Sequence, residues 1–127
     1  MGMYTKAVFK LELIDPSWKV FFHAIQNDIS TSVPDHEFFS CQRWRQVIDS
    51  ISMKRHSKDI IIDVELKNYD GELDLFLRWM AEHIQKDTVA PTYLGWTQYE
   101  ECYVPTHWYL LNNKIIEIIP FEEQEYV

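Results

Sequence analysis

The spacing of hydrophobic residues changes repeatedly along this chain, and this change constrains the fold more than any other feature. Residues 3–13 alternate between two sets of side chains, which predicts a strand with one exposed face. Asp15-Pro16 follows and is a favourable start for a helix. From Trp18 to about Asn27 the apolar residues recur at helical spacing, so the chain begins with a strand and a helix.

The later segments repeat this contrast. Asp35 is placed to cap a second helix that runs to about Ser52, and Asp70 is placed to cap a third helix with an apolar face over residues 73–84. Strict alternation predicts a second strand over residues 60–67. Three further strands are predicted at about Thr92–Tyr103, Thr106–Leu111 and Lys114–Ile119, with a two-residue turn at Asn112-Asn113.

The order β-α-α-β-α-β-β-β predicts an α+β fold, a two-layer sandwich with the helices on one face of a single sheet. Because long helical connections separate the first strands, we expect a mixed sheet that ends in an antiparallel meander. The 127 residues, of which 46% are hydrophobic and 15% aromatic, are enough for one domain with its own core. Residues 1–120 are assigned to this domain and 121–127 to an acidic C-terminal tail.

Composition excludes several classes of function. With 12 Lys and Arg against 20 Asp and Glu, the formal charge is −8, which argues against nucleic acid as a direct partner. Three glycines are too few for a phosphate-binding loop. No signal segment and no membrane-spanning apolar run is visible, and Cys41 and Cys102 form no Cys-x-x-Cys pair. We therefore expect a cytoplasmic protein without membrane contact.

The sequence contains no recognisable catalytic signature. The five histidines include no pair at the i, i+4 spacing of helical metal ligands, and His36-Glu37 is followed by Ser40 where a zinc-protease helix needs its second histidine. Cys41 and Cys102 are interpreted as structural thiols, since adjacent carboxylates oppose thiolate formation at Cys102. We expect no catalytic residue, no metal site and no cofactor.

The most unusual segment is 95–109, in which two Trp, three Tyr, one His and two Glu occur together. Aromatic rings with polar tips supply large contact areas, and carboxylates select basic partners. The segment therefore predicts a partner-binding surface that consists of Trp96, Tyr99, Glu100, Glu101, Tyr103, His107 and Trp108. The alternative is that these rings form cross-strand pairs that only stabilise the sheet.

Charge is distributed unevenly. Positive charge gathers in residues 43–58, and negative charge gathers in residues 100–127. The basic segment is either a contact for phosphate or an acidic protein, or a solvated helix end. The acidic segment is suited to steering a basic target by long-range attraction.

Three hypotheses follow. The first is a small acidic binding protein that inhibits a basic target which handles nucleic acid, in the manner of an immunity protein against a nuclease-type toxin or an anti-defence protein. The second is a small-ligand or hydrolytic domain that uses segment 95–109 as a pocket, with Glu101 and His107 as acid or base; a deep pocket there would favour it. The third is a module in which exposed aromatics seal a homodimer.

Overall fold

The structure is a computed structural model that describes residues 3–28, 32–87 and 89–119. The predicted acidic tail, 121–127, lies outside these residues. The described chain forms strands β1 (Tyr4–Glu12), β2 (Ile51–Met53), β3 (Asp59–Lys67), β4 (Thr92–Tyr99), β5 (Thr106–Leu111) and β6 (Lys114–Ile118). Its helices are α1 (Trp18–Asn27), α2 (Trp44–Asp49) and α3 (Glu72–Met80), with 3-10 helices η1 (Glu37–Ser40) and η2 (Ala81–His83).

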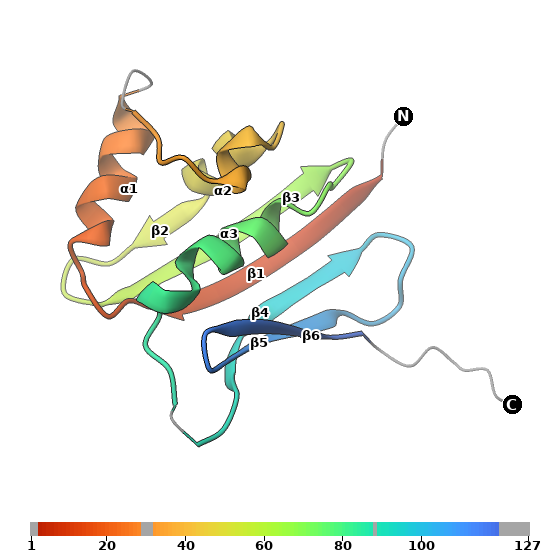
Figure 1. The fold of residues 1–127 in the computed structure, drawn as a ribbon. Helices are drawn as coiled ribbons and strands as arrows, with labels where there is room; N and C mark the ends of the chain where they lie inside the picture. Colours follow the sequence, from red (N-terminus) through yellow and green to blue (C-terminus); the bar gives the residue numbers. More distant parts are fainter. Residues whose placement is uncertain (1–2, 29–31, 88, 120–127) are drawn as a thin grey trace, which may run out of the picture.

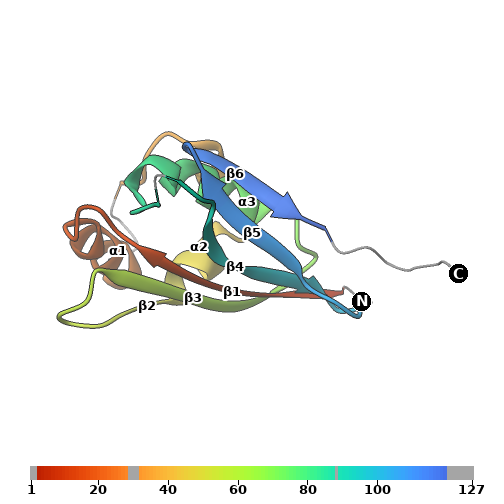
Figure 2. The same ribbon diagram turned by 90° about the horizontal axis from the view of Figure 1, so that it is seen from below.

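The six strands form one sheet in the order β2-β3-β1-β4-β5-β6, and all three α-helices lie on one face of it (Figures 1 and 2). This confirms the predicted α+β fold with its helices on one face. β4, β5 and β6 are consecutive antiparallel neighbours, as predicted. β1 lies between β3 and β4, so the sheet as a whole is not a meander.

The prediction of a mixed sheet is wrong, because every pair of neighbouring strands is antiparallel. The physical reason is β2, which the sequence analysis assigned to the end of the second helix. β2 pairs with β3 as a hairpin and reverses the chain before β3 enters the sheet. β3 therefore returns antiparallel to β1 rather than parallel to it.

The predicted second helix is also divided. In place of one helix from Asp35 to Ser52 the chain forms η1, α2 and β2. The Gln26 side chain of α1 donates hydrogen bonds of 2.9 Å to the carbonyl oxygens of both Ile48 and Ile51, which ends α2 and turns the chain into the sheet. The His36 ring, not Asp35, accepts the capping bond at the start of η1, from the amide of Phe38.

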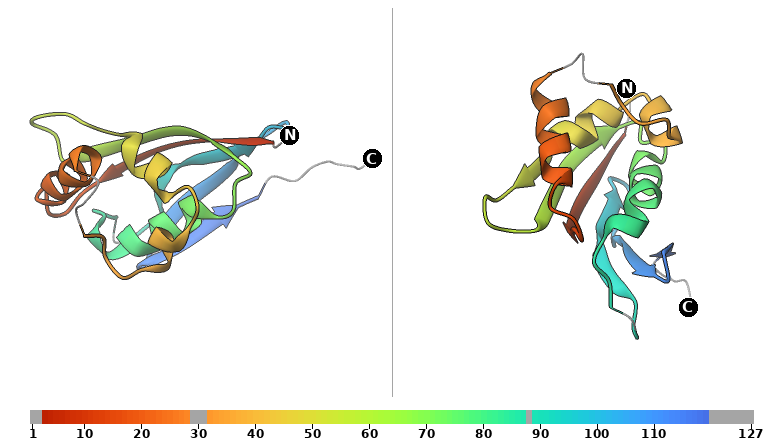
Figure 3. Two further views of the ribbon diagram at one scale, coloured as in Figure 1. Left: turned by 90° about the horizontal axis from the view of Figure 1, so that it is seen from above. Right: turned by 60° about the vertical axis from the view of Figure 1, so that its left-hand side comes forward.

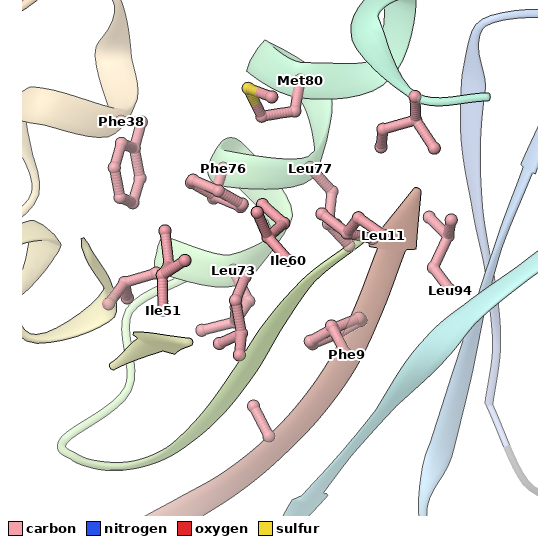
Figure 4. Packing of buried hydrophobic residues seen from close by; sticks show 14 of the residues in the cluster. Phe9, Leu11, Phe38, Ile51, Ile60, Leu73, Phe76, Leu77, Met80 and Leu94 are labelled. Carbon is pink, nitrogen blue, oxygen red and sulfur yellow. The ribbon is translucent and has the colours of Figure 1, made fainter. Parts of the chain in front are cut away.

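The core lies between the helices and the sheet face beneath them. Alternate residues of β1 and β3 are buried, as the period-two pattern predicted. α3 buries Leu73, Phe76, Leu77 and Met80, one face of a helix, against Phe9, Leu11 and Ile60 of these strands (Figure 4). Rings from α1, η1 and α3 pack around Trp79, so much of the aromatic content joins the helices to one another.

The sheet bends around α3. The views from below and from the side show β5 and β6 rising beside this helix, on the same side of the sheet as the helix layer (Figures 2 and 3). Gly95 permits the bend, because β4 shifts register between Tyr93 and Gly95 and Gly95 has a φ of 152°. The Asn112-Asn113 turn between β5 and β6 is confirmed, with φ of 51° and 63°.

Candidate functional site

Segment 95–109 is divided between two strands, as predicted, but the first of these strands is shorter than expected. β4 ends at Tyr99 rather than at residue 103, because Glu100 closes the sheet against the start of β1. The Glu100 amide donates to the carbonyl of Tyr4 at 2.9 Å, and its carboxylate accepts from the amide of Tyr4 at 2.7 Å. The Cys102 amide then donates to the carbonyl of Tyr99, and residues 100–105 form a loop. The predicted strand at about Thr92–Tyr103 therefore stops at Tyr99.

Trp108 lies on the inner face of the sheet and is only 5% exposed. Its indole N–H donates to the hydroxyl of Thr97 at 3.0 Å, and its ring meets Phe9 edge-on at 6.5 Å. The interpretation of Trp108 as an exposed contact residue is therefore corrected: it is a core residue whose ring also forms part of a cavity wall.

Trp96 and His107 are cross-strand partners on the opposite, outer face of the sheet. Tyr93 and Tyr109 lie beside them, and the Tyr93 hydroxyl is 2.7 Å from Nδ1 of His107. Partial burial, followed by the neighbouring Tyr109, raises the pKa of Tyr93 above its ordinary value. These rings pair across the strands on the uncovered face of the sheet, and they lie away from Tyr99 and the 100–105 loop.

The remaining predicted residues gather at one end of the sandwich, which we call the acidic end. It consists of two connections, residues 68–74 and 99–105, and it lies at the right in Figure 1, where α3 begins and β4 ends. Its carboxylates are Asp70, Glu72, Asp74, Glu100 and Glu101, and neither connection contains Lys, Arg or His. Tyr103 is 97% exposed at the tip of the second connection.

Lys67 and Arg78 adjoin the acidic end, and Arg78 is paired with Asp74 at 3.0 Å, but the larger cluster of positive charge lies at the other end of the sheet. Lys54, Arg55 and Lys58 occur in the turn between β2 and β3, at the left in Figure 1 and far from the acidic end. The Lys19 ammonium group joins them by donating to the carbonyl of Ser57 at 2.6 Å. The uneven charge seen along the sequence is thus an uneven charge across the molecule.

A cavity of about 640 Å³ opens at the acidic end, between the start of α3 and the inner face of the sheet. This volume falls within the range of small-ligand sites, about 300–1,000 Å³. Its walls come from four separate parts of the chain. They comprise Met3, Thr5, Asn68, Tyr69, Gly71, Asp74, Thr97, Tyr99, Cys102, Val104, Thr106, Trp108, Glu117 and Ile119.

Two side chains at the start of α3 accept hydrogen bonds from backbone amides there. The amide of Asp74 donates to the hydroxyl of Tyr69 at 3.4 Å, and Glu72 accepts from the amide of Asp70 at 2.8 Å. The predicted cap, Asp70, is not used; Gly71 occupies the cap position at a φ of 81°. Burial raises the pKa of Tyr69 well above its ordinary value, so its phenol is neutral at physiological pH.

Catalytic machinery is not assembled around this cavity in the described part of the chain. Cys102 lines it, but among the described residues no histidine does, and His107 faces the other side of the sheet. Burial and then nearby carboxylates raise the pKa of Cys41. In residues 3–28, 32–87 and 89–119 no three His, Cys, Asp or Glu side chains are grouped to hold a metal ion.

Several cavity residues were not identified from the sequence. They come from separate parts of the chain, and only the strand order and the position of α3 bring them together. These residues are Thr5, Tyr69, Asp74 and Glu117. The sequence predicts a turn at residues 68–71, and no local pattern marks Thr5, Asp74 or Glu117 as cavity residues. The sequence signal for the cavity was segment 95–109, which contributes Thr97, Tyr99, Cys102, Val104, Thr106 and Trp108 to its lining.

Over the described residues no helix is both long and apolar enough to cross a membrane. Comparison of the chain with protein-family models, with curated proteins and with solved structures found no match.

Proposed function

We propose that this chain is an acidic binding protein that inhibits a basic, nucleic-acid-handling protein and contacts it through the acidic end. The observation that carries the proposal is the composition of this end. Two adjoining connections bring the carboxylates of Asp70, Asp74, Glu100 and Glu101 and two exposed tyrosines to the surface, while the basic turn lies at the opposite end. The proposed role is that of an immunity-type or anti-defence inhibitor in the cytoplasm.

The physical argument concerns the surface that such a target presents. A phosphate-binding site carries clustered Lys and Arg, so a surface rich in carboxylates competes with the nucleic acid for it. The net charge of −8 speeds encounter with a basic protein by long-range attraction. Tyr99 and Tyr103 add large contact areas at a low cost in side-chain entropy.

A small-ligand domain is the second candidate, and the cavity itself favours it. Its volume of about 640 Å³ and its mixture of rings, hydroxyls and carboxylates suit a small molecule. The two candidates share the acidic end and differ in what occupies it.

The test begins with capture of partners from the native host, at low and at moderate salt, on the wild-type protein and on two variants of equal charge change. Glu101→Lys alters the acidic end, and Glu12→Lys alters an exposed carboxylate at the far end of β1. A captured protein is then purified, and its affinity for all three chains is measured by calorimetry.

The proposal expects a partner of positive net charge that binds one to one and weakens with salt. Glu101→Lys should weaken binding about tenfold or more, whereas Glu12→Lys should change it by less than about threefold. Equal affinity of the wild type and of Glu101→Lys would overturn the proposal. So would a homodimer, seen by light scattering, that retains no partner.

A further inference from the structure

The chemistry of the cavity lining identifies the kind of group that it accepts. Asp74 and Glu117 are its acidic side chains, and none of its lining residues in the described chain is basic. The Asp74 carboxylate also accepts from the Arg78 guanidinium at 3.0 Å through Oδ1. Glu117 is exposed on β6 and has no ion-pair partner among the described residues, so its charge is available to a ligand.

Rings and hydroxyls complete the lining. Tyr69, Tyr99 and Trp108 contribute aromatic surface, which attracts cations through the negative faces of the rings. Thr97 and Thr106 are cross-strand partners on the cavity floor, and Thr5 lies on the adjacent strand. Thr5 and Thr97 are almost fully buried, and the Thr97 hydroxyl already accepts from Trp108, whereas Thr106 is half-buried and its hydroxyl oxygen is an acceptor for an N–H group of a cation.

A helix that starts at a cavity would normally favour an anion, because its first amides are unpaired. Here this preference is cancelled. The hydroxyl of Tyr69 already accepts from the amide of Asp74, and the first turn of α3 contains the carboxylates of Glu72 and Asp74. The lining therefore repels anions and offers acceptors to cations.

We propose that the cavity accepts a protonated arginine side chain carried by the basic partner. This inference rests on the proposed function and specifies which group the acidic end recognises. The guanidinium has five N–H donors in a plane, which suits a site that combines a carboxylate, a threonine hydroxyl and a flat ring. Glu117 pairs with the charge, and the ring of Tyr99, which is 41% exposed, covers the plane.

The experiment uses a free probe, so that it does not depend on the partner. N-acetyl-arginine amide is added to the full chain, with N-acetyl-citrulline amide as the neutral control of the same shape. Cys102 lines the cavity and is exposed, so its alkylation by iodoacetamide reports occupancy, and Cys41 in the same molecule is the internal reference. The indole N–H resonance of Trp108 provides a second reading that needs no chemical labelling.

We expect the arginine probe, but not the citrulline probe, to slow alkylation of Cys102 severalfold and to shift the Trp108 resonance, with Cys41 unaffected. Glu117→Gln should weaken probe binding up to about fivefold, as expected for a partly exposed ion pair, and Glu12→Gln should leave it unchanged. Equal effects of the two probes would overturn the inference.

Failure of the inference and failure of the proposed function are distinguishable. If a basic partner binds in a Glu101-dependent way but the arginine probe protects nothing, the cavity assignment is wrong and the proposed function stands. If the probe protects Cys102 but no basic partner exists, the cavity is a site for a free organic cation. The inhibitor function then fails.

Discussion

Replacement of Gly95 by alanine should be among the most damaging single substitutions in this protein. Gly95 lies at the register shift of β4, directly across from Phe9 of β1. A Cβ added there would overlap the carbonyl oxygen of Val8 and would lie 2.7 Å from both Cα and Cδ1 of Phe9. Two of these three atoms belong to the backbone of the neighbouring strand, so β1 and β4 would have to separate.

The magnitude has two parts. An L-residue at the positive φ of Gly95 costs about 1–3 kcal/mol, and overpacking against the backbone costs about 1–3 kcal/mol more. The loss is thus about 2–6 kcal/mol, a large part of the stability of a small domain, about 5–15 kcal/mol. With an unfolding entropy of about 2.1 cal/mol/K per residue, the melting temperature of this chain should fall by about 7–22 °C.

Gly71 supplies the matched control. It also has a positive φ, 81°, but a Cβ there meets no atom within 4 Å. Gly71→Ala should cost only about 1 kcal/mol, or about 4 °C, because backbone strain is partly offset by the lower entropy of the unfolded chain. Both variants are measured by calorimetry and by urea denaturation. Equal losses at Gly71 and Gly95 would refute the argument from close approach of the strands.

Two further predictions concern buried ionisable groups. Glu72 is fully buried, and its Oε2 has no hydrogen-bond partner in the described residues. The substitution Glu72→Gln keeps an acceptor for the amide of Asp70 and removes the carboxylate. It should raise the free energy of unfolding by about 1–2 kcal/mol. A matching change at exposed Glu82 should be neutral, and a loss of stability in Glu72→Gln would contradict the reasoning. Burial raises the pKa of Tyr69 in the folded state, so the stability contributed by its protonated form is present below pH 10 and is lost as the pH rises further. The free energy of unfolding, measured by urea denaturation, should therefore fall less between pH 9 and 11 for Tyr69→Phe than for the wild type. An equal fall in the two proteins would contradict the argument from the Tyr69 pKa.

Local patterns determined most of the secondary structure. The alternation of apolar and polar residues in β1 and β3 predicts a sheet with one buried face. The apolar period of 3.6 residues in α3 predicts a helix that covers this face. The Asn112-Asn113 turn was also predictable, because asparagine tolerates positive φ. These features depend on neighbours within a few residues, and the sequence displays those neighbours directly.

Tertiary contacts decided the rest. The apolar spacing of residues 35–52 predicted one long helix. In the structure the Gln26 side chain bonds to carbonyls at the end of α2, and residues 51–53 pair with β3 as a strand. β4 ends at Tyr99, where Glu100 bonds to Tyr4, 96 residues earlier in the chain. The cavity likewise joins residues from both ends of the chain. Its chemistry follows from strand order and from the placement of α3, which are properties of the packed molecule and not of any short stretch of sequence.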